Sequence, residues 1–179
     1  MQPRVMALVL AGLVALSRSA AGQTISAGLR GGVTFPVGSY GDSGSTLSTG
    51  WNVGASARVD FGSTRFGAQL DVGYSGNTIN GSPYGEISDW QAGLGVLFRF
   101  LPITSPIRPY VLAGGGVDYW QDNSGNGLVP AFYGSGGVDL RLNPIEPYVE
   151  VQYRNVWTPG PNLATVQLMF GVRYILGYR

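Results

Sequence analysis

The sequence lacks several residue types, and each absence narrows what the chain can be. It has no cysteine, which excludes a disulfide framework and a thiolate metal site. It has no histidine, so a serine nucleophile would lack a general base that works near neutral pH. Its basic residues are all arginine, and a formal net charge of +1 gives no clustered basic face, so we expect no nucleic-acid partner.

Charged residues are also scarce. They make up 12% of the chain, about half of the roughly 25% usual in soluble globular proteins. The 179 residues suffice for one domain with a full core. Beyond residue 23 no segment has a convincing apolar period of 3.6 residues, so helices are not expected.

The N-terminus has the pattern of an export signal. Arg4 precedes the apolar run VMALVLAGLVAL at 5–16, and the small residues SAAG follow at 19–22. This run is too short to cross a bilayer, which takes about 20 residues, and it fits the core of a Sec-type signal peptide. We predict a signal peptide at 1–22 and a mature domain at 23–179; the alternative is a buried N-terminal helix.

In the mature chain, apolar residues alternate with polar or very small ones, as in strands that have two different faces. The alternation occupies eight segments, at 25–37, 51–61, 66–74, 90–100, 110–119, 132–141, 149–157 and 166–178. Short connections at 62–65, 102–107 and 143–146 alternate with connections at 38–50, 76–86, 121–129 and 158–162, most of them longer. This predicts an all-β fold, an eight-stranded antiparallel up-and-down barrel with its longer loops at one end.

The polar face of these strands carries the charges. If that face touched lipid, each arginine at mid-depth would cost about 2–4 kcal/mol, and the sum would rival a typical total stability of about 5–15 kcal/mol. As the outside of a soluble barrel, the face would be unusually poor in charge. We therefore predict a transmembrane barrel with a charge network inside its lumen, which either fills the lumen or lines a gated ion path. The predicted network is Arg30, Arg58, Asp60, Asp71, Arg99, Asp118, Asp139, Arg141, Glu150, Arg154 and Arg173.

Aromatic residues mark both ends of the apolar rows, as in the two interface girdles of a membrane barrel. Those near the loops are Phe35, Trp51, Tyr74, Trp90, Tyr119, Phe132 and Trp157. Those toward the turns are Phe61, Phe66, Phe98, Phe100 and Tyr174.

Three consecutive glycines in LAGGGVDYW at 112–120 resemble a phosphate-binding turn. The third glycine of the dinucleotide fingerprint is missing, and the residues that follow favour a strand. We expect Gly114 and Gly116 to face the lumen and to make room for guanidinium groups. Gly115, Gly134 and Gly136 fall on the outer face, where they either ease strand coiling or form a groove for a lipid or another barrel.

The signal segment, the eight alternating strands, the loop asymmetry and the final strand FGVRYILGY together resemble the small outer-membrane β-barrel superfamily of OmpA, OmpX and OmpW type. The resemblance covers residues 23–179 and implies the outer membrane of a Gram-negative bacterium. It also implies outer-membrane lipids and the barrel-assembly machinery as partners. The family's assembly signal usually ends on an aromatic residue, whereas here Arg179 follows Tyr178.

Three further features of the sequence exclude classes of function. The outer-membrane barrels that hydrolyse or transfer acyl chains, and the omptin-type proteases, resemble one another in relying on an active-site histidine, so we expect no enzyme. The acids Asp42, Glu86, Asp89 and Asp122 are scattered and expected to be solvated, so no metal or cofactor is predicted. Eight strands enclose too little space for a diffusion porin. Two functions stay open: a structural, envelope-integrity barrel whose loops contact an unspecified extracellular ligand, and an OmpW-like barrel that passes small or hydrophobic solutes.

Overall fold

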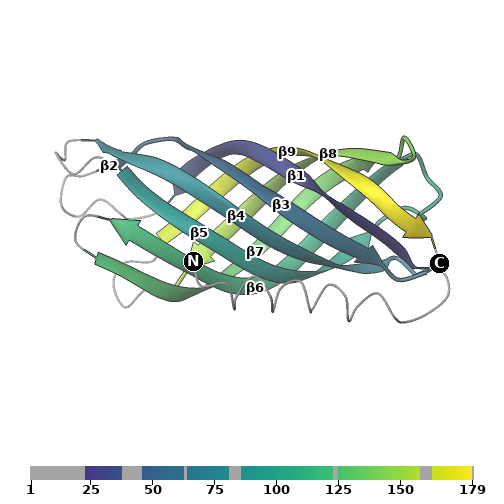
Figure 1. The fold of residues 1–179 in the computed structure, drawn as a ribbon, viewed down its shortest axis with the longest axis horizontal. Helices are drawn as coiled ribbons and strands as arrows, with labels where there is room; N and C mark the ends of the chain where they lie inside the picture. The colour runs from purple at the N-terminus through teal and green to yellow at the C-terminus, as the bar shows by residue number, and fades with distance from the viewer. Residues whose placement is uncertain are drawn as a thin grey trace.

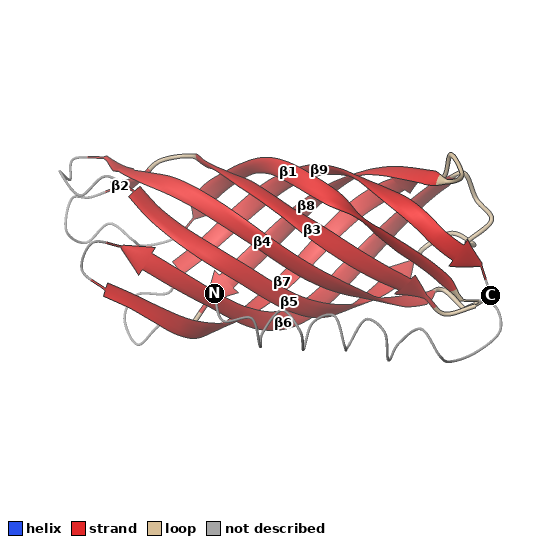
Figure 2. Cartoon of the chain, viewed as in Figure 1, coloured by secondary structure: helices blue, strands red, loops and turns tan. Residues whose placement is uncertain are grey.

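The chain forms a closed antiparallel barrel (Figures 1 and 2). The computed structural model describes residues 23–37, 46–62, 64–80, 86–122, 125–157 and 163–178. Eight long strands pair in a meander, and β1 pairs with β9 to close the barrel, which confirms the predicted fold. The strands are β1 (Thr24–Val37), β2 (Thr46–Leu47), β3 (Gly50–Asp60), β4 (Phe66–Asn80), β5 (Glu86–Arg99), β6 (Ile107–Asp122), β7 (Gly125–Leu140), β8 (Ile145–Val156) and β9 (Leu163–Tyr178).

Several strands are longer than the alternation of apolar residues predicts. β4 continues to Asn80, and β6 and β7 reach Asp122 and Gly125, within segments predicted as loops. The two-residue strand β2 pairs with the end of β4. Residues 1–22, the predicted signal peptide, lie outside the described part of the chain. Across the described residues we find no helix with the length and apolar character needed to cross a membrane.

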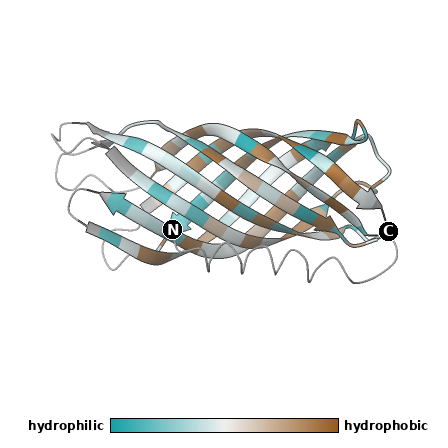
Figure 3. Cartoon of the chain, viewed as in Figure 1, coloured by the Kyte–Doolittle hydropathy of each residue, from teal (hydrophilic) through white to brown (hydrophobic). Residues whose placement is uncertain are grey.

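The two faces of the wall differ as the alternation predicts. Hydrophobic and hydrophilic positions alternate along the strands (Figure 3). Leu29 on the outer face is 73% exposed, whereas Arg58 and Asp139 on the inner face are fully buried. The apolar rows therefore cover the outside of the barrel, and the charged rows fill its inside.

The aromatic residues of both predicted girdles lie on the outer face. Near the loop end, the rings of Trp51, Tyr74 and Trp90 pack in tilted contacts across β3, β4 and β5, with centroids 5.5 and 5.0 Å apart. Toward the turns, Phe66 packs on Phe98 at 5.3 Å. Aromatic contacts thus join β3, β4 and β5 near the loops, and β4 and β5 toward the turns.

The outer face of β6 and β7 has little side-chain cover around three glycines. A methyl group built on Gly115 would come no closer than 3.6 Å to another residue, and one on Gly134 no closer than 3.8 Å. At Gly136 nothing lies within 4 Å of that position. These three glycines leave the outer surface open.

Candidate functional site in the barrel lumen

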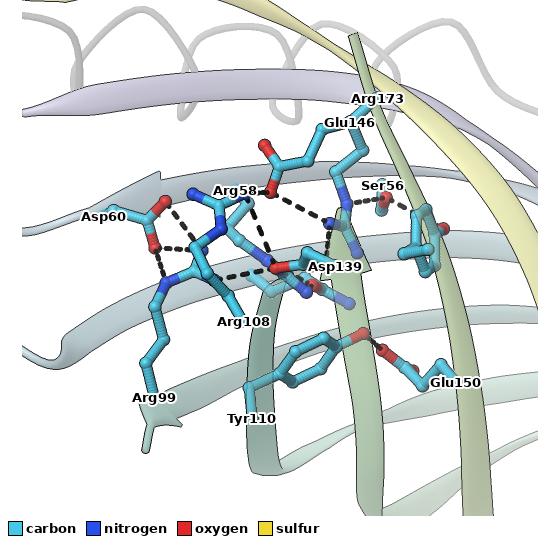
Figure 4. Close-up of polar contacts among 12 residues, drawn as sticks. Ser56, Arg58, Asp60, Arg99, Arg108, Tyr110, Asp139, Glu146, Glu150 and Arg173 are labelled. Carbon is cyan, nitrogen blue, oxygen red and sulfur yellow. Dashed lines mark hydrogen bonds and ion pairs between the residues drawn. The ribbon is translucent and has the colours of Figure 1, made fainter. Parts of the chain in front are cut away.

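Asp139, on β7, is the centre of the lumen's charge network. Its Oδ2 accepts hydrogen bonds from Nη1 of Arg58 and Nη1 of Arg99, both at 2.7 Å. Its Oδ1 accepts one from Nη1 of Arg173 at 2.9 Å. These arginines come from β3, β5 and β9, so one carboxylate joins strands from different sides of the barrel (Figure 4). Such charge-assisted bonds are roughly twice as strong as neutral ones.

The charges around Asp139 balance. Arg99 also binds Asp60, with Nη2 at 2.6 and 2.8 Å from the two carboxylate oxygens. Arg108 donates to Glu146, and Tyr110 donates its hydroxyl to Glu150 at 2.5 Å. We call this group of four arginines and four carboxylates the turn-side cluster: Arg58, Asp60, Arg99, Arg108, Asp139, Glu146, Glu150 and Arg173, each at most 2% exposed.

Two more ion pairs lie toward the loop end. Nη1 of Arg30 is 3.0 Å from Oδ1 of Asp71, and Arg154 donates to both oxygens of Asp118. Gln69 connects these charges to the turn-side cluster, because its Oε1 accepts from Nε of Arg58 at 2.8 Å and its Nε2 donates to Asp71 at 3.1 Å. Polar contacts therefore extend from the turn-side cluster into the loop half of the lumen.

Three lumen tyrosines fit against glycines of neighbouring strands. Tyr110, Tyr133 and Tyr148 stand directly opposite Gly137, Gly114 and Gly171 in the strand register. An arginine packs over each ring: Arg58 over Tyr110 at 4.4 Å, Arg154 over Tyr133 at 5.4 Å and Arg173 over Tyr148 at 3.6 Å. Such contacts combine ring packing with a cation–π attraction.

The expectation that Gly114 and Gly116 make room for guanidinium groups is wrong. A methyl group on Gly114 would lie 2.8 Å from Cζ of Tyr133, and one on Gly116 would lie 2.0 Å from the Ala92 carbonyl oxygen. The space is taken by a tyrosine ring and by the neighbouring backbone. Guanidinium atoms approach Gly54 and Gly73 instead, where Nε and Nη2 of Arg30 lie 3.2 and 3.6 Å from the built methyl positions.

Most predicted lumen residues point inward, but Arg141 does not join the ion pairs above. It follows the end of β7 at Leu140, is only half-buried, and its Nη1 donates to the Ile103 carbonyl at 2.6 Å. The predicted strand extends one residue beyond the observed one. Arg108 and Glu146 were missed, because Arg108 lies next to the predicted turn at 102–107 and Glu146 lies within the predicted turn at 143–146. Arg108 nevertheless continues the inward row of Tyr110.

The prediction for Asp89 is also wrong. It was expected to be a solvated loop acid, but it lies within β5, where its carboxylate accepts from Ser75 and from Nε2 of Gln91 at 2.7 Å. Trp90 and Ala92 alternate with Asp89 and Gln91, and this period of two continues the strand toward the loop. That pattern could have identified Asp89 as an inward-facing residue.

Comparisons with known proteins agree with this geometry. The family model described as "Outer membrane protein beta-barrel domain" matches residues 6–174. Neisserial surface protein A is similar over 88% of this chain and 99% of its own, at 16% identity and a TM-score of 0.64. AlkL, solved in lipid bilayers, is similar over 89% of this chain and 93% of its own, at 18% identity and a TM-score of 0.50. No curated protein matches the sequence.

Proposed function

Because this chain belongs to the outer membrane protein β-barrel domain family, we propose that it is a sealed structural barrel that supports the outer membrane of a Gram-negative bacterium. The observation that carries this proposal is the turn-side cluster. Arg58, Arg108 and Arg173 are fully buried, and Arg99 and Glu150 are 1% exposed. A lumen filled by interlocked charged side chains is suited to stiffness and closure rather than to passage.

The outer face supports a role in the lipid layer. Aromatic side chains prefer the boundary between acyl tails and headgroups, where a ring contacts apolar groups and its polar atom contacts water. The exposed girdle residues include Trp51, Trp90 and Trp157 near the loops and Phe66, Phe100 and Tyr174 toward the turns. With the apolar rows between them, they would hold the barrel at a fixed depth.

The charges of the loop sequences limit which partners the loops could bind. Segments 38–50, 76–86, 121–129 and 158–162 contain no arginine or lysine, and their only charges are Asp42, Glu86 and Asp122. A sulfated or phosphorylated polyanion would find no cationic side chain there. We therefore expect the loops to contact neutral or cationic partners. The proposal includes no catalytic role, since the sequence has no histidine and the lumen carboxylates described above accept hydrogen bonds from arginine, glutamine, serine or tyrosine side chains.

Conductance in a planar bilayer tests the seal. We expect the wild-type barrel to produce no steady unitary currents, because the turn-side cluster blocks the lumen. Removing two neutral pairs at once, in the variant Asp60→Ser, Arg99→Ser, Asp139→Ser, Arg173→Ser, should keep the charge balance while removing half of the turn-side cluster, and small steady channels should then appear.

A heat-dependent shift in gel migration will show that each variant is folded before it is tested. Steady currents from the wild type would contradict the sealed barrel and favour the alternative function, passage of small solutes. Silence of the folded quadruple variant would show that something other than the cluster closes the barrel.

A further inference from the structure

Uncharged polar side chains and a single carboxylate line part of the loop half of the lumen. We call this group the loop-side collar: Thr34, Asn52, Ser75, Asp89, Gln91 and Gln167, from strands β1, β3, β4, β5 and β9. Asn52, Ser75 and Asp89 stand opposite one another in consecutive strands. Gln167 stands beside Thr34, and its Nε2 reaches across to Oε1 of Gln91 at 3.4 Å. Strands β5 and β9 do not pair, so this contact spans the lumen.

The collar carries one negative charge, on the carboxylate of Asp89. The arginines of the loop half, Arg30 and Arg154, are paired with Asp71 and Asp118. Among the described residues, no cationic side chain lies within ion-pair distance of Asp89, whose hydrogen bonds come from Ser75 and Gln91. Asp89 is half-buried, and a carboxylate that is partly removed from water without an ion-pair partner gains from a bound cation.

The collar also presents buried oxygens without hydrogen-bond partners. Oδ1 of Asn52 and Oε1 of Gln167 accept no hydrogen bond from any described residue, although the side chains are 5% and 1% exposed. Gln152, directly opposite Gln167, has an unpartnered Oε1 as well. An unsatisfied buried acceptor costs about 1–3 kcal/mol, so these oxygens need a partner. The amide of Asn52 is oriented by its own donation to Thr34 at 3.1 Å.

These groups share one chemistry. A carboxylate, side-chain amide oxygens and hydroxyls are the ligands of hard cations such as Ca²⁺, which takes six to eight oxygens, whereas soft metals prefer the thiolates that this chain lacks. We propose that the loop-side collar binds a hard metal cation of the Ca²⁺ class, with Asp89 as its charged ligand and Asn52 and Gln167 as neutral ligands.

The composition of the collar sets the expected affinity. The collar contains one carboxylate, and within the part of the chain that the structure describes no three His, Cys, Asp or Glu side chains are placed to hold a metal ion together, so neutral oxygens dominate the collar. Sites with few carboxylates bind Ca²⁺ with dissociation constants of about 10⁻⁴–10⁻³ M, as extracellular modules do. The collar belongs to the barrel end that carries the longer loops, where it would respond to millimolar cation in the medium.

Terbium luminescence provides a direct test on the full-length folded barrel. Tb³⁺ replaces Ca²⁺ at oxygen sites and emits when a nearby indole is excited. Trp120 stands directly opposite Asp89, and its indole packs on the Gly127 backbone. We expect Tb³⁺ emission that millimolar Ca²⁺ displaces, and a rise in the melting temperature on adding Ca²⁺ alone.

Variants inside and outside the loop-side collar test whether the metal binds there or elsewhere. Asp89→Asn should weaken the apparent affinity for Ca²⁺ roughly tenfold or more, and Gln167→Leu should weaken it with the charge retained. Asp122→Asn removes one charge from the end of β6 and should change nothing. Trp120→Phe should lose emission and keep the Ca²⁺-dependent rise in melting temperature.

Two results would overturn the proposal. One is a wild-type barrel that shows neither emission nor a Ca²⁺-dependent melting temperature, because water alone would then satisfy the collar. The other is an unchanged affinity in both Asp89→Asn and Gln167→Leu, which would place the metal elsewhere. If Asp89→Asn does not fold, Gln167→Leu decides between these outcomes.

Discussion

Replacing Asp139 with asparagine should destabilise the barrel by about 3–5 kcal/mol, the usual cost of breaking a buried ion pair by removing one partner. The new side chain would keep the shape of the aspartate but lose its charge, and its amide NH₂ would face guanidinium donors. Arg58, Arg99 and Arg173 would then share a neutral oxygen in a buried part of the lumen. Equilibrium unfolding by guanidinium chloride in lipid vesicles, followed by tryptophan fluorescence, measures the change.

Glu150→Gln is the matched control. It also neutralises one fully buried carboxylate of the turn-side cluster, but the hydrogen bond to Glu150 comes from the Tyr110 hydroxyl, which an amide oxygen can still accept. We expect a clearly smaller loss than for Asp139→Asn. In the double variant Asp139→Asn, Arg173→Gln, part of the lost stability should return because the charges balance again. Equal losses in the two single variants would show that Asp139 has no special role.

Adding one methyl group to Gly114 should cost about 1–3 kcal/mol or more, because the space is already filled. The new Cβ would lie 2.5 Å from the Leu94 carbonyl oxygen, 2.7 Å from Cα of Gly95 and 2.8 Å from the Tyr133 ring. Two of these contacts are backbone atoms held by the strand ladder, so they cannot turn away. Gly114→Ala should therefore lower the unfolding midpoint in the same vesicle assay.

The adjacent glycine provides the control. Gly115 lies on the same strand but points outward, where the nearest atoms would be 3.6 Å from the new methyl group, an ordinary contact. Alanine there restricts the unfolded chain and adds apolar surface, so Gly115→Ala should be neutral or stabilising by about 0.5 kcal/mol. If both variants lost the same stability, the glycines would be needed for strand coiling rather than for close packing.

The strands and their faces could be predicted from the sequence because a barrel wall has a period of two and only one of its faces tolerates charge. Arg58, Asp71 and Glu150 each lie within a predicted strand, and their inward placement follows from that period alone. At strand ends the alternation no longer identifies the inward-facing residues. Glu146 follows Pro144 in a stretch that resembles a turn, and Asp89 follows a polar, glycine-rich segment, so both were assigned to connections.

The partners within the lumen could not be predicted. Alternation says which way a side chain points, but the contacts of Asp139 depend on strand register and on which strands face each other across the cavity. Arg58 and Asp139 are separated by 81 residues along the chain and come from strands that do not pair. The fit of Tyr133 against Gly114 likewise depends on register, because it requires that β6 and β7 align these two residues.

The position of Asp139 has a consequence for the order of events during biogenesis. One of its three guanidinium partners, Arg173, comes from β9, which is synthesised after the strands that carry Asp139 and the other two arginines. Until β9 docks between β8 and β1, the Asp139 carboxylate lacks one of its guanidinium partners. Before β9 docks, water must therefore hydrate these charged side chains. We expect that water to leave when β9 docks.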